Sequence, residues 1–111
     1  MNKQKILITG GAGFVGTNLI KSLKIQKPQA ELFVIDNFST GYKHNKQEGV
    51  KYYSSDVSSD IASQYMEEIS PDVIYHLAAL ARIQPSFNFP NPTFDSNTVG
   101  TQRVLEFARK N

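Results

Sequence analysis

The feature that most constrains this chain is an apolar run that passes directly into glycines and then into a helical pattern. Residues 5–9 read Lys-Ile-Leu-Ile-Thr, which is typical of a buried strand, and from Phe14 onward apolar residues recur at helical spacing. The intervening glycines fit two patterns at once: G-x-G-x-x-G at Gly11, Gly13 and Gly16, and G-x-x-G-x-x-G at Gly10, Gly13 and Gly16. The order of strand, glycine turn and helix predicts a dinucleotide-binding turn in a parallel α/β sheet.

Each glycine has a different predicted role. The first must turn the chain sharply out of the strand, where only glycine adopts a positive φ at low cost. Gly13 lets the backbone approach a pyrophosphate, and Gly16 lets the helix pack closely on the strand. The helix N-terminus then presents N–H groups and a positive dipole end to the anion. The alternative is a glycine turn that binds nothing.

A carboxylate follows at the spacing that such a site requires. The second apolar run, Leu32 to Ile35, ends at Asp36, about 20 residues beyond Gly16. A carboxylate there accepts hydrogen bonds from a ribose diol and repels a 2′-phosphate, which favours NAD over NADP. Asn37, Ser39 and Thr40 follow in a polar loop that can line the same ribose. The alternative is a surface aspartate at a strand end.

The whole chain alternates strands with helices. Strands are expected near 5–9, 31–36, 50–54 and 72–77, and helices near 14–26, 60–69 and 92–110. The residues from Asp56 to Ser59 include the N-cap candidates of the second helix. This alternation predicts a Rossmann-type, doubly wound parallel sheet of four βα units, truncated after the fourth, with strand order 3-2-1-4.

Composition restricts the remaining classes. A length of 111 residues predicts one domain, 1–111. The net charge of +2 comes with scattered lysines and no apolar run of about 20 residues, so neither a nucleic acid nor a membrane is an expected partner. The chain has no cysteine and two histidines, so we expect neither a disulfide nor a metal site. A cytoplasmic location is the default expectation.

Two further segments lie at predicted carboxyl ends of strands, where ligands of such sheets bind. Asp56 and Val57 follow the third strand, where they could contact an adenine, although Asp56 could equally cap the next helix. His76-Leu77-Ala78-Ala79 ends the fourth strand, and its small residues leave room for a nucleotide. His76 itself is expected to be a packed strand residue rather than a catalyst.

One pattern is misleading. Tyr42 and Lys46 match Y-x-x-x-K, a spacing that places both side chains on one helical face. They lie in the loop after the second strand, beside the expected adenosine end of the cofactor. Since hydride chemistry takes place at the nicotinamide end, we expect no catalytic role for this pair.

Taken in order, these motifs resemble the extended short-chain dehydrogenase/reductases, in particular the NAD-dependent nucleotide-sugar epimerases and dehydratases, with the UDP-glucose 4-epimerases most alike. Thr9 to Gly16 is similar to the family's T-G-x-x-G-x-x-G, and Ile35 to Gly41 to its V-D-N-x-x-x-G. Asp56-Val57 matches D-[VIL], His76 to Ala79 matches H-L-A-A, and Asn97 to Thr101 resembles N-V-x-G-T. The likeness covers almost the whole chain.

The resemblance implies that NAD is the cofactor and names the residues that bind it. They are Gly10, Gly13, Phe14, Val15, Gly16, Asp36, Asn37, Ser39, Thr40, Gly41, Asp56, Val57, Leu77, Ala78, Ala79 and Asn97. It further implies that Ser86 lies on the side from which a sugar nucleotide approaches. In the family a tyrosine, assisted by a lysine and a serine or threonine, takes a proton from a sugar hydroxyl while hydride passes to NAD.

The same resemblance places that catalytic tyrosine and lysine beyond residue 111, so no catalytic residue is assigned here. The chain is therefore expected to be the N-terminal portion of such an enzyme, inactive alone, and to meet a UDP-sugar only if a missing half completes it. The alternatives are a non-catalytic dinucleotide-binding sensor or interaction module, and a structural fragment with no occupied site. Because the outer edge of the fourth strand would be uncovered, we expect a homodimer or a domain-swapped assembly.

Overall fold

Four parallel strands form the central sheet of the computed structural model, which describes residues 3–37, 46–78 and 99–111. The strands are β1 (Lys5–Thr9), β2 (Glu31–Asp36), β3 (Val50–Ser54) and β4 (Val73–His76), arranged in the order β3-β2-β1-β4. All three pairings are parallel. The predicted strand order is therefore confirmed.

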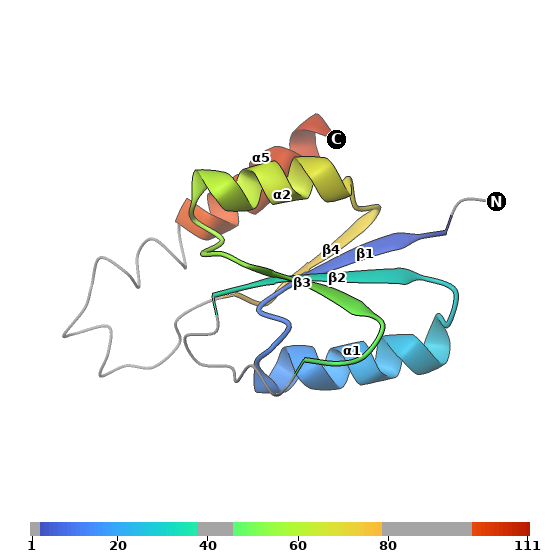
Figure 1. Ribbon diagram of the computed structural model, residues 1–111. Coiled ribbons are helices and arrows are strands. Elements are labelled where there is room, and N and C mark those ends of the chain that lie inside the picture. Colours follow the sequence, from blue (N-terminus) through green and yellow to red (C-terminus); the bar gives the residue numbers. More distant parts are fainter. Residues whose placement is uncertain (1–2, 38–45, 79–98) are drawn as a thin grey trace.

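Helices cover both faces of this sheet. Helix α1 (Phe14–Gln26) lies on one face, and α2 (Asp60–Ile69) and α5 (Gly100–Lys110) lie side by side on the other (Figure 1). Alternate residues of β1 divide between the two layers. Ile6 and Ile8 pack with Ile20 of α1, whereas Leu7 packs with the buried side chains of α2 and α5. A strand buried on both faces explains why β1 reads as a continuous apolar run.

The predicted element bounds hold within one residue for β1, α1, β2, β3 and α2. The fourth strand, predicted over 72–77, forms over Val73–His76, although the Asp72 and Leu77 N–H groups still donate to β1 carbonyls. The predicted start of the last helix near Pro92 lies outside the described residues. In the described part of that helix, Val104 and Phe107 are buried and Leu105 is exposed.

The start of α2 shows which residue of the predicted capping window acts as the cap. The Ser59 Oγ accepts a hydrogen bond from the Ala62 N–H at 3.1 Å, so Ser59 is the N-cap. Asp56 has a different role, because its Oδ1 accepts from the Ser58 N–H and from the Ser58 hydroxyl. The alternative of Asp56 as the helix cap was therefore wrong, since its carboxylate closes the turn before the helix.

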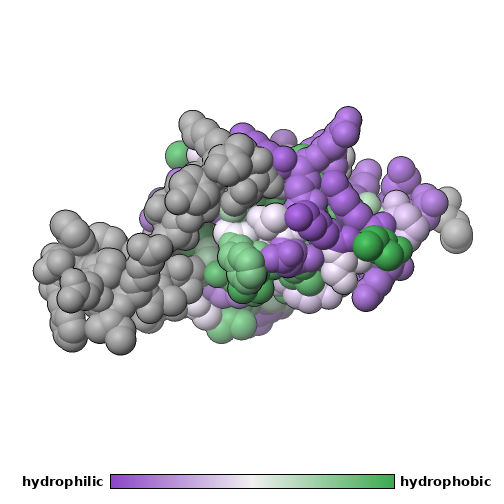
Figure 2. All heavy atoms as spheres, turned by 90° about the horizontal axis from the view of Figure 1, so that it is seen from below, coloured by the Kyte–Doolittle hydropathy of each residue, from purple (hydrophilic) through white to green (hydrophobic). Residues whose placement is uncertain are grey.

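The face that carries α1 shows separate apolar and polar groups rather than one continuous apolar surface (Figure 2). Ile25, for example, is exposed on α1. No helix in the described ranges has the length and apolar character needed to cross a membrane.

Candidate functional site

The glycine turn connects β1 to α1, and its geometry distinguishes the two glycine spacings. Gly10 has a φ of +74°, so Gly10 is the residue that turns the chain. Its N–H donates to the Ile35 carbonyl of β2 at 2.9 Å. Gly11 is required for another reason, because a Cβ there would lie 2.6 Å from a methyl carbon of Val34. The pattern that describes the turn is therefore G-x-x-G-x-x-G.

Gly13 and Gly16 have contrasting surroundings. Among the described residues, a Cβ on Gly13 would meet only the Gly10 carbonyl oxygen, at 3.5 Å. A Cβ on Gly16 would lie 2.5 Å from that same oxygen and 2.6 Å from the Gly11 Cα. The close packing predicted for Gly16 is present, but its immediate partner is the backbone of the turn. Gly13 instead borders a space that a ligand could enter.

The N-terminus of α1 is electrostatically suited to an anion. Gly13 is its N-cap and provides no side-chain hydrogen bond, and the first turn contains no acidic residue. The first N–H groups of a helix have no partner within the helix, and the helix dipole is positive at this end. Phe14 and Val15 follow and are 84% and 62% exposed, so the helix begins at the surface.

Asp36 lies beside this turn, at the carboxyl end of β2. The residue is only 8% exposed, and its Oδ2 accepts a hydrogen bond from the Ala12 N–H at 2.9 Å. The structure thus brings the predicted ribose-binding carboxylate and the glycine turn together. The adjacent Asn37 is exposed. Ser39, Thr40 and Gly41 lie outside the described residues, as does Tyr42 of the Y-x-x-x-K pattern.

The carboxyl end of β4 is fixed to the same turn through Thr9. The Thr9 hydroxyl accepts hydrogen bonds from the Leu77 N–H at 3.0 Å and the Ala78 N–H at 3.1 Å. A Cβ on Gly10 would lie only 2.9 Å from the Ala78 nitrogen, so the two backbones are in direct contact. Leu77 and Ala78 therefore lie beside the glycine turn, and their contact with a cofactor stays a prediction. Ala79, Ser86 and Asn97 lie outside the described residues.

Sequence reasoning did not identify Thr9 as a site residue. The sequence did contain a signal for this role, because Thr9 is a polar residue at the end of an apolar strand. In the structure Thr9 is fully buried. Most buried hydroxyl groups form hydrogen bonds, and at a strand end neighbouring backbone groups are within reach.

His76 is held at both ring nitrogens. Its Nδ1 lies 2.7 Å from the Thr9 Oγ1, and its Nε2 lies 2.9 Å from the Thr101 Oγ1 of α5. Burial lowers the pKa of the imidazole from its ordinary value of 6.5. These contacts agree with the prediction of a packed strand residue.

Asp56 and Val57 follow β3. Asp56 is partly exposed, whereas Val57 is buried. Val57 is 4% exposed and packs in the core with residues such as Leu7 and Met66. The Oδ1 of Asp56 is bonded to Ser58, and within the described part of the chain its Oδ2 makes no hydrogen bond. The adenine contact predicted for this pair stays a prediction, with Asp56 Oδ2 as the available atom.

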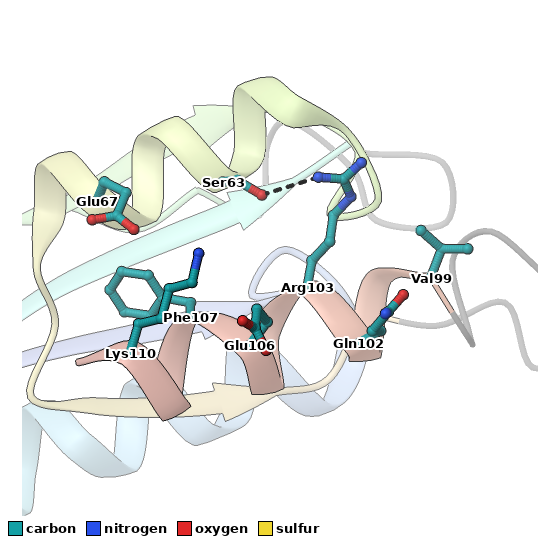
Figure 3. A pocket seen from close by; sticks show the side chains of 8 residues that line it. All are labelled: Ser63, Glu67, Val99, Gln102, Arg103, Glu106, Phe107 and Lys110. Atoms are coloured by element: carbon teal, nitrogen blue, oxygen red, sulfur yellow. Dashed lines mark hydrogen bonds between the residues drawn. The ribbon is translucent and has the colours of Figure 1, made fainter.

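A pocket of about 380 Å³ opens elsewhere, between α2 and α5 (Figure 3). Side chains from these helices line it, and Arg103 reaches from α5 to the Ser63 hydroxyl and pairs with Asp60. None of the described residues predicted to bind a cofactor lines this pocket. Within residues 3–37, 46–78 and 99–111, no three His, Asp or Glu side chains gather in a way that would hold a metal ion.

The region around the glycine turn has the parts that a dinucleotide needs. Gly13 leaves space at an uncapped helix N-terminus, which suits a pyrophosphate. Asp36 is fixed beside the turn at the end of the neighbouring strand, which suits a ribose. The carboxyl ends of β1 and β4 lie beside the same turn. The residues present therefore fit a dinucleotide.

Comparison with known proteins agrees with this geometry. Residues 6–111 match the model of the NAD dependent epimerase/dehydratase family. UDP-glucuronic acid decarboxylase 1 of Danio rerio is 36% identical over an alignment of 111 positions, which covers 98% of this chain and 25% of that protein.

Two solved structures share the fold. The UDP-glucose 4-epimerase of Thermus thermophilus, in complex with NAD, is 30% identical with a TM-score of 0.86. The UDP-glucose 4-epimerase of Thermotoga maritima, with UDP-glucose, is 28% identical with a TM-score of 0.88. In both cases the match covers 96% of this chain and 34% of the other. The chain thus spans a quarter to a third of the length of these relatives.

Proposed function

The chain belongs to the NAD dependent epimerase/dehydratase family, and from this premise we propose that its glycine turn binds NAD and that residues 1–111 form the dinucleotide-binding portion of an enzyme that converts nucleotide sugars. The observation that carries the proposal is that, among the described residues, only the Gly10 carbonyl oxygen lies within 4 Å of a Cβ built on Gly13, at a helix N-terminus without a side-chain cap. The pyrophosphate would lie there, against the backbone of Phe14, Val15 and Gly16.

The choice of NAD over NADP rests on Asp36. Asp36 is buried, and its carboxylate accepts from the Ala12 N–H, so the charge is held beside the proposed ribose position. A second hydrogen bond from a ribose diol would add to this arrangement. A 2′-phosphate would instead place its negative charge against a carboxylate that cannot leave.

Bound NAD would supply a hydride acceptor and donor for a sugar carbon. The substrate class, a nucleotide sugar such as a UDP-sugar, is proposed from the relatives, which include a UDP-glucuronic acid decarboxylase and UDP-glucose 4-epimerases. These proteins are three to four times longer than the matched part. We accordingly propose that the 111-residue chain binds the cofactor but does not convert a sugar nucleotide alone.

Calorimetric titration of the chain with NAD⁺, and separately with NADP⁺, tests the binding proposal. We expect saturable binding of NAD⁺ and at least tenfold weaker binding of NADP⁺. At an NAD⁺ concentration 100 times Kd, the free energy of unfolding should rise by about 2.7 kcal/mol. Equal affinity for both cofactors would contradict the role of Asp36, and no binding of either would contradict the cofactor proposal.

A turnover assay with UDP-glucose or UDP-galactose in the presence of NAD⁺ tests the second proposal. We expect no epimerised product from the chain alone. Robust turnover would overturn the proposal that catalysis requires a further part of the protein.

A further inference from the structure

The hydrogen bonds of Thr9 determine the protonation state of His76. A threonine hydroxyl has two acceptor sites and one proton to donate. The Thr9 Oγ1 accepts from the N–H groups of Leu77 and Ala78, so its own proton is directed to the His76 Nδ1, 2.7 Å away. Nδ1 is then unprotonated, and the ring proton lies on Nε2, where it donates to the Thr101 Oγ1.

Protonation of Nδ1 is incompatible with this arrangement. It would place two donors opposite each other, unless the Thr9 hydroxyl turned to accept from the ring and released one backbone N–H. The Leu77 N–H also donates to the Thr9 carbonyl at 3.0 Å, so it would keep one hydrogen bond. The Ala78 N–H would lose its hydrogen bond to the Thr9 hydroxyl. Ala78 is the residue whose backbone contacts Gly10 at the turn.

We propose that Thr9, His76 and Thr101 form a positioning relay, in which neutral His76 holds the carboxyl end of β4 against the glycine turn, so that protonation of His76 weakens binding of NAD. This inference rests on the proposed function, because its readout is affinity for the cofactor. His76 and Thr101 are positioning residues here, since they act through Thr9 and the backbone of β4.

The charged side chains on the surrounding elements form ion pairs or hydrogen bonds with groups other than the imidazole. On α5, Arg103 pairs with Asp60 of α2 at 2.9 Å, and Glu106 pairs with Arg109. Asp72 accepts from the Lys5 N–H at the opposite end of β4, and Asp36 of β2 accepts from Ala12. In the described part of the chain His76 contacts hydroxyl groups, and burial is the cause of its lowered pKa. Its titration therefore reports the relay itself.

The first measurement is nuclear magnetic resonance of the imidazole groups in the 111-residue chain. The sequence contains two histidines, so the variant His44→Gln assigns the His76 signals. We expect the Nε2–H form of His76 and a pKa below 6.5, which NAD⁺ lowers further because binding and deprotonation favour the same state. An Nδ1–H form, or a pKa that NAD⁺ leaves unchanged, would overturn the relay.

The second measurement is the Kd for NAD⁺ between pH 5 and pH 8. If NAD⁺ binds only to the form with neutral His76, Kd is constant above pH 7 and rises up to tenfold per pH unit below the pKa of His76. His76→Gln should abolish this dependence, while His44→Gln should keep it. The dependence surviving in His76→Gln would overturn the relay. If NAD⁺ did not bind at pH 8, both the proposed function and the relay would be overturned. If NAD⁺ bound at pH 8 with a Kd that did not change when His76 became protonated, the relay alone would be overturned.

Hydroxyl variants provide a matched comparison. Thr101→Val should raise the Kd for NAD⁺ by two- to tenfold, and Thr101→Ser should restore it, because serine keeps the acceptor. Thr17 offers the control: its buried hydroxyl has no hydrogen-bond partner among the described residues, so Thr17→Val should leave Kd unchanged. Equal effects of Thr101→Val and Thr17→Val would contradict the relay.

Discussion

At the scale of single residues, Gly13 and Gly16 lie three positions apart and face opposite requirements. We expect Gly13→Ala to fold normally, with a free energy of unfolding within about 1 kcal/mol of the parent, because among the described residues the added methyl makes only an ordinary contact of 3.5 Å with the Gly10 carbonyl oxygen. The same methyl should remove NAD⁺ binding, since it occupies the proposed place of the pyrophosphate. Gly16→Ala should instead lose about 2 kcal/mol of stability, because its methyl meets turn backbone at 2.5 Å.

Denaturant unfolding and NAD⁺ titration of the two variants separate these effects. If Gly13→Ala bound NAD⁺ as tightly as the parent, Gly13 would not border the cofactor site.

Asp36 combines a structural and a proposed binding role, which Asp36→Asn can separate. An asparagine keeps an oxygen that can accept from the Ala12 N–H, so the turn should remain intact. It loses the charge, so affinity for NAD⁺ should fall by about tenfold to a hundredfold, in line with about 1.5–3 kcal/mol for a hydrogen bond to a charged group. Affinity for NADP⁺ should fall less, because the repulsion of a 2′-phosphate also disappears. Calorimetry with both cofactors measures the ratio, and an unchanged preference for NAD⁺ would contradict the role of the charge.

At the scale of elements, the cap of α2 can be tested independently of the cofactor site. Ser59→Ala removes the acceptor of the Ala62 N–H and should lower the free energy of unfolding by about 1 kcal/mol. Ser59→Asp keeps an acceptor and adds a negative charge at the helix N-terminus, so it should retain the parent stability. Thermal or denaturant unfolding distinguishes them, and equal losses in both variants would mean that the serine acts through its bonds to Ser55 and Asp56 instead.

Most elements could be predicted from the sequence because their apolar periods are regular and their ends carry turn residues. The strand order followed from the alternation of strands and helices, and the family resemblance is confirmed by the matched family model. What the sequence left open depended on three-dimensional contact. Two glycine spacings fitted the sequence equally well. The positive φ of Gly10 shows which glycine turns the chain, and the position of Val34 explains why Gly11 is also a glycine.

The same limit applies to side-chain roles in the candidate site. Asp56 and Ser59 are both good caps by residue type, and the choice depends on which oxygen reaches the Ala62 N–H. Thr9 belonged to a recognised motif, but its link to Ala78 joins residues 69 positions apart, which no local pattern contains. The burial of Val57 in the core likewise depends on side chains from distant parts of the chain, such as Leu7.

At the scale of the whole molecule, His76 should make folding stability depend on pH. Its pKa is lower in the folded chain than its ordinary value of 6.5, so the unfolded chain binds the proton first as the pH falls. Its contribution is complete above about pH 7 and declines as the pH falls through 6.5 toward the folded pKa, by at most about 1.4 kcal/mol per pH unit. Glu106 has a pKa lowered from 4.5 by Arg109, so it titrates in a more acidic range. Denaturant unfolding between pH 5 and pH 8 should show a slope that His76→Gln reduces; an identical slope in that variant would assign it to other groups.

The two edges of the sheet differ in a way that bears on assembly. The β3 edge carries Lys51, and an exposed lysine is one of the features that discourage strand pairing between molecules. The β4 strand, Val-Ile-Tyr-His, has no charged residue of this kind, and within the described ranges it pairs only with β1. Tyr75 on this strand is 36% exposed. An unpaired, uncharged edge favours association, so we expect the chain to form dimers through β4 or by exchange of the segment that follows it.

Sedimentation velocity over a range of concentrations measures this association. We expect a dimer to accumulate as concentration rises, and Tyr75→Lys to shift the equilibrium toward monomer by at least tenfold in Kd, because it places a charge on the edge. Ile25→Lys provides the matched control: it adds the same charge at an exposed position on α1, away from the edge, and should leave the dimer intact. A monomer at every concentration would show that the β4 edge is protected in solution. Dissociation by both variants would instead mean that net charge, rather than the strand edge, governs association.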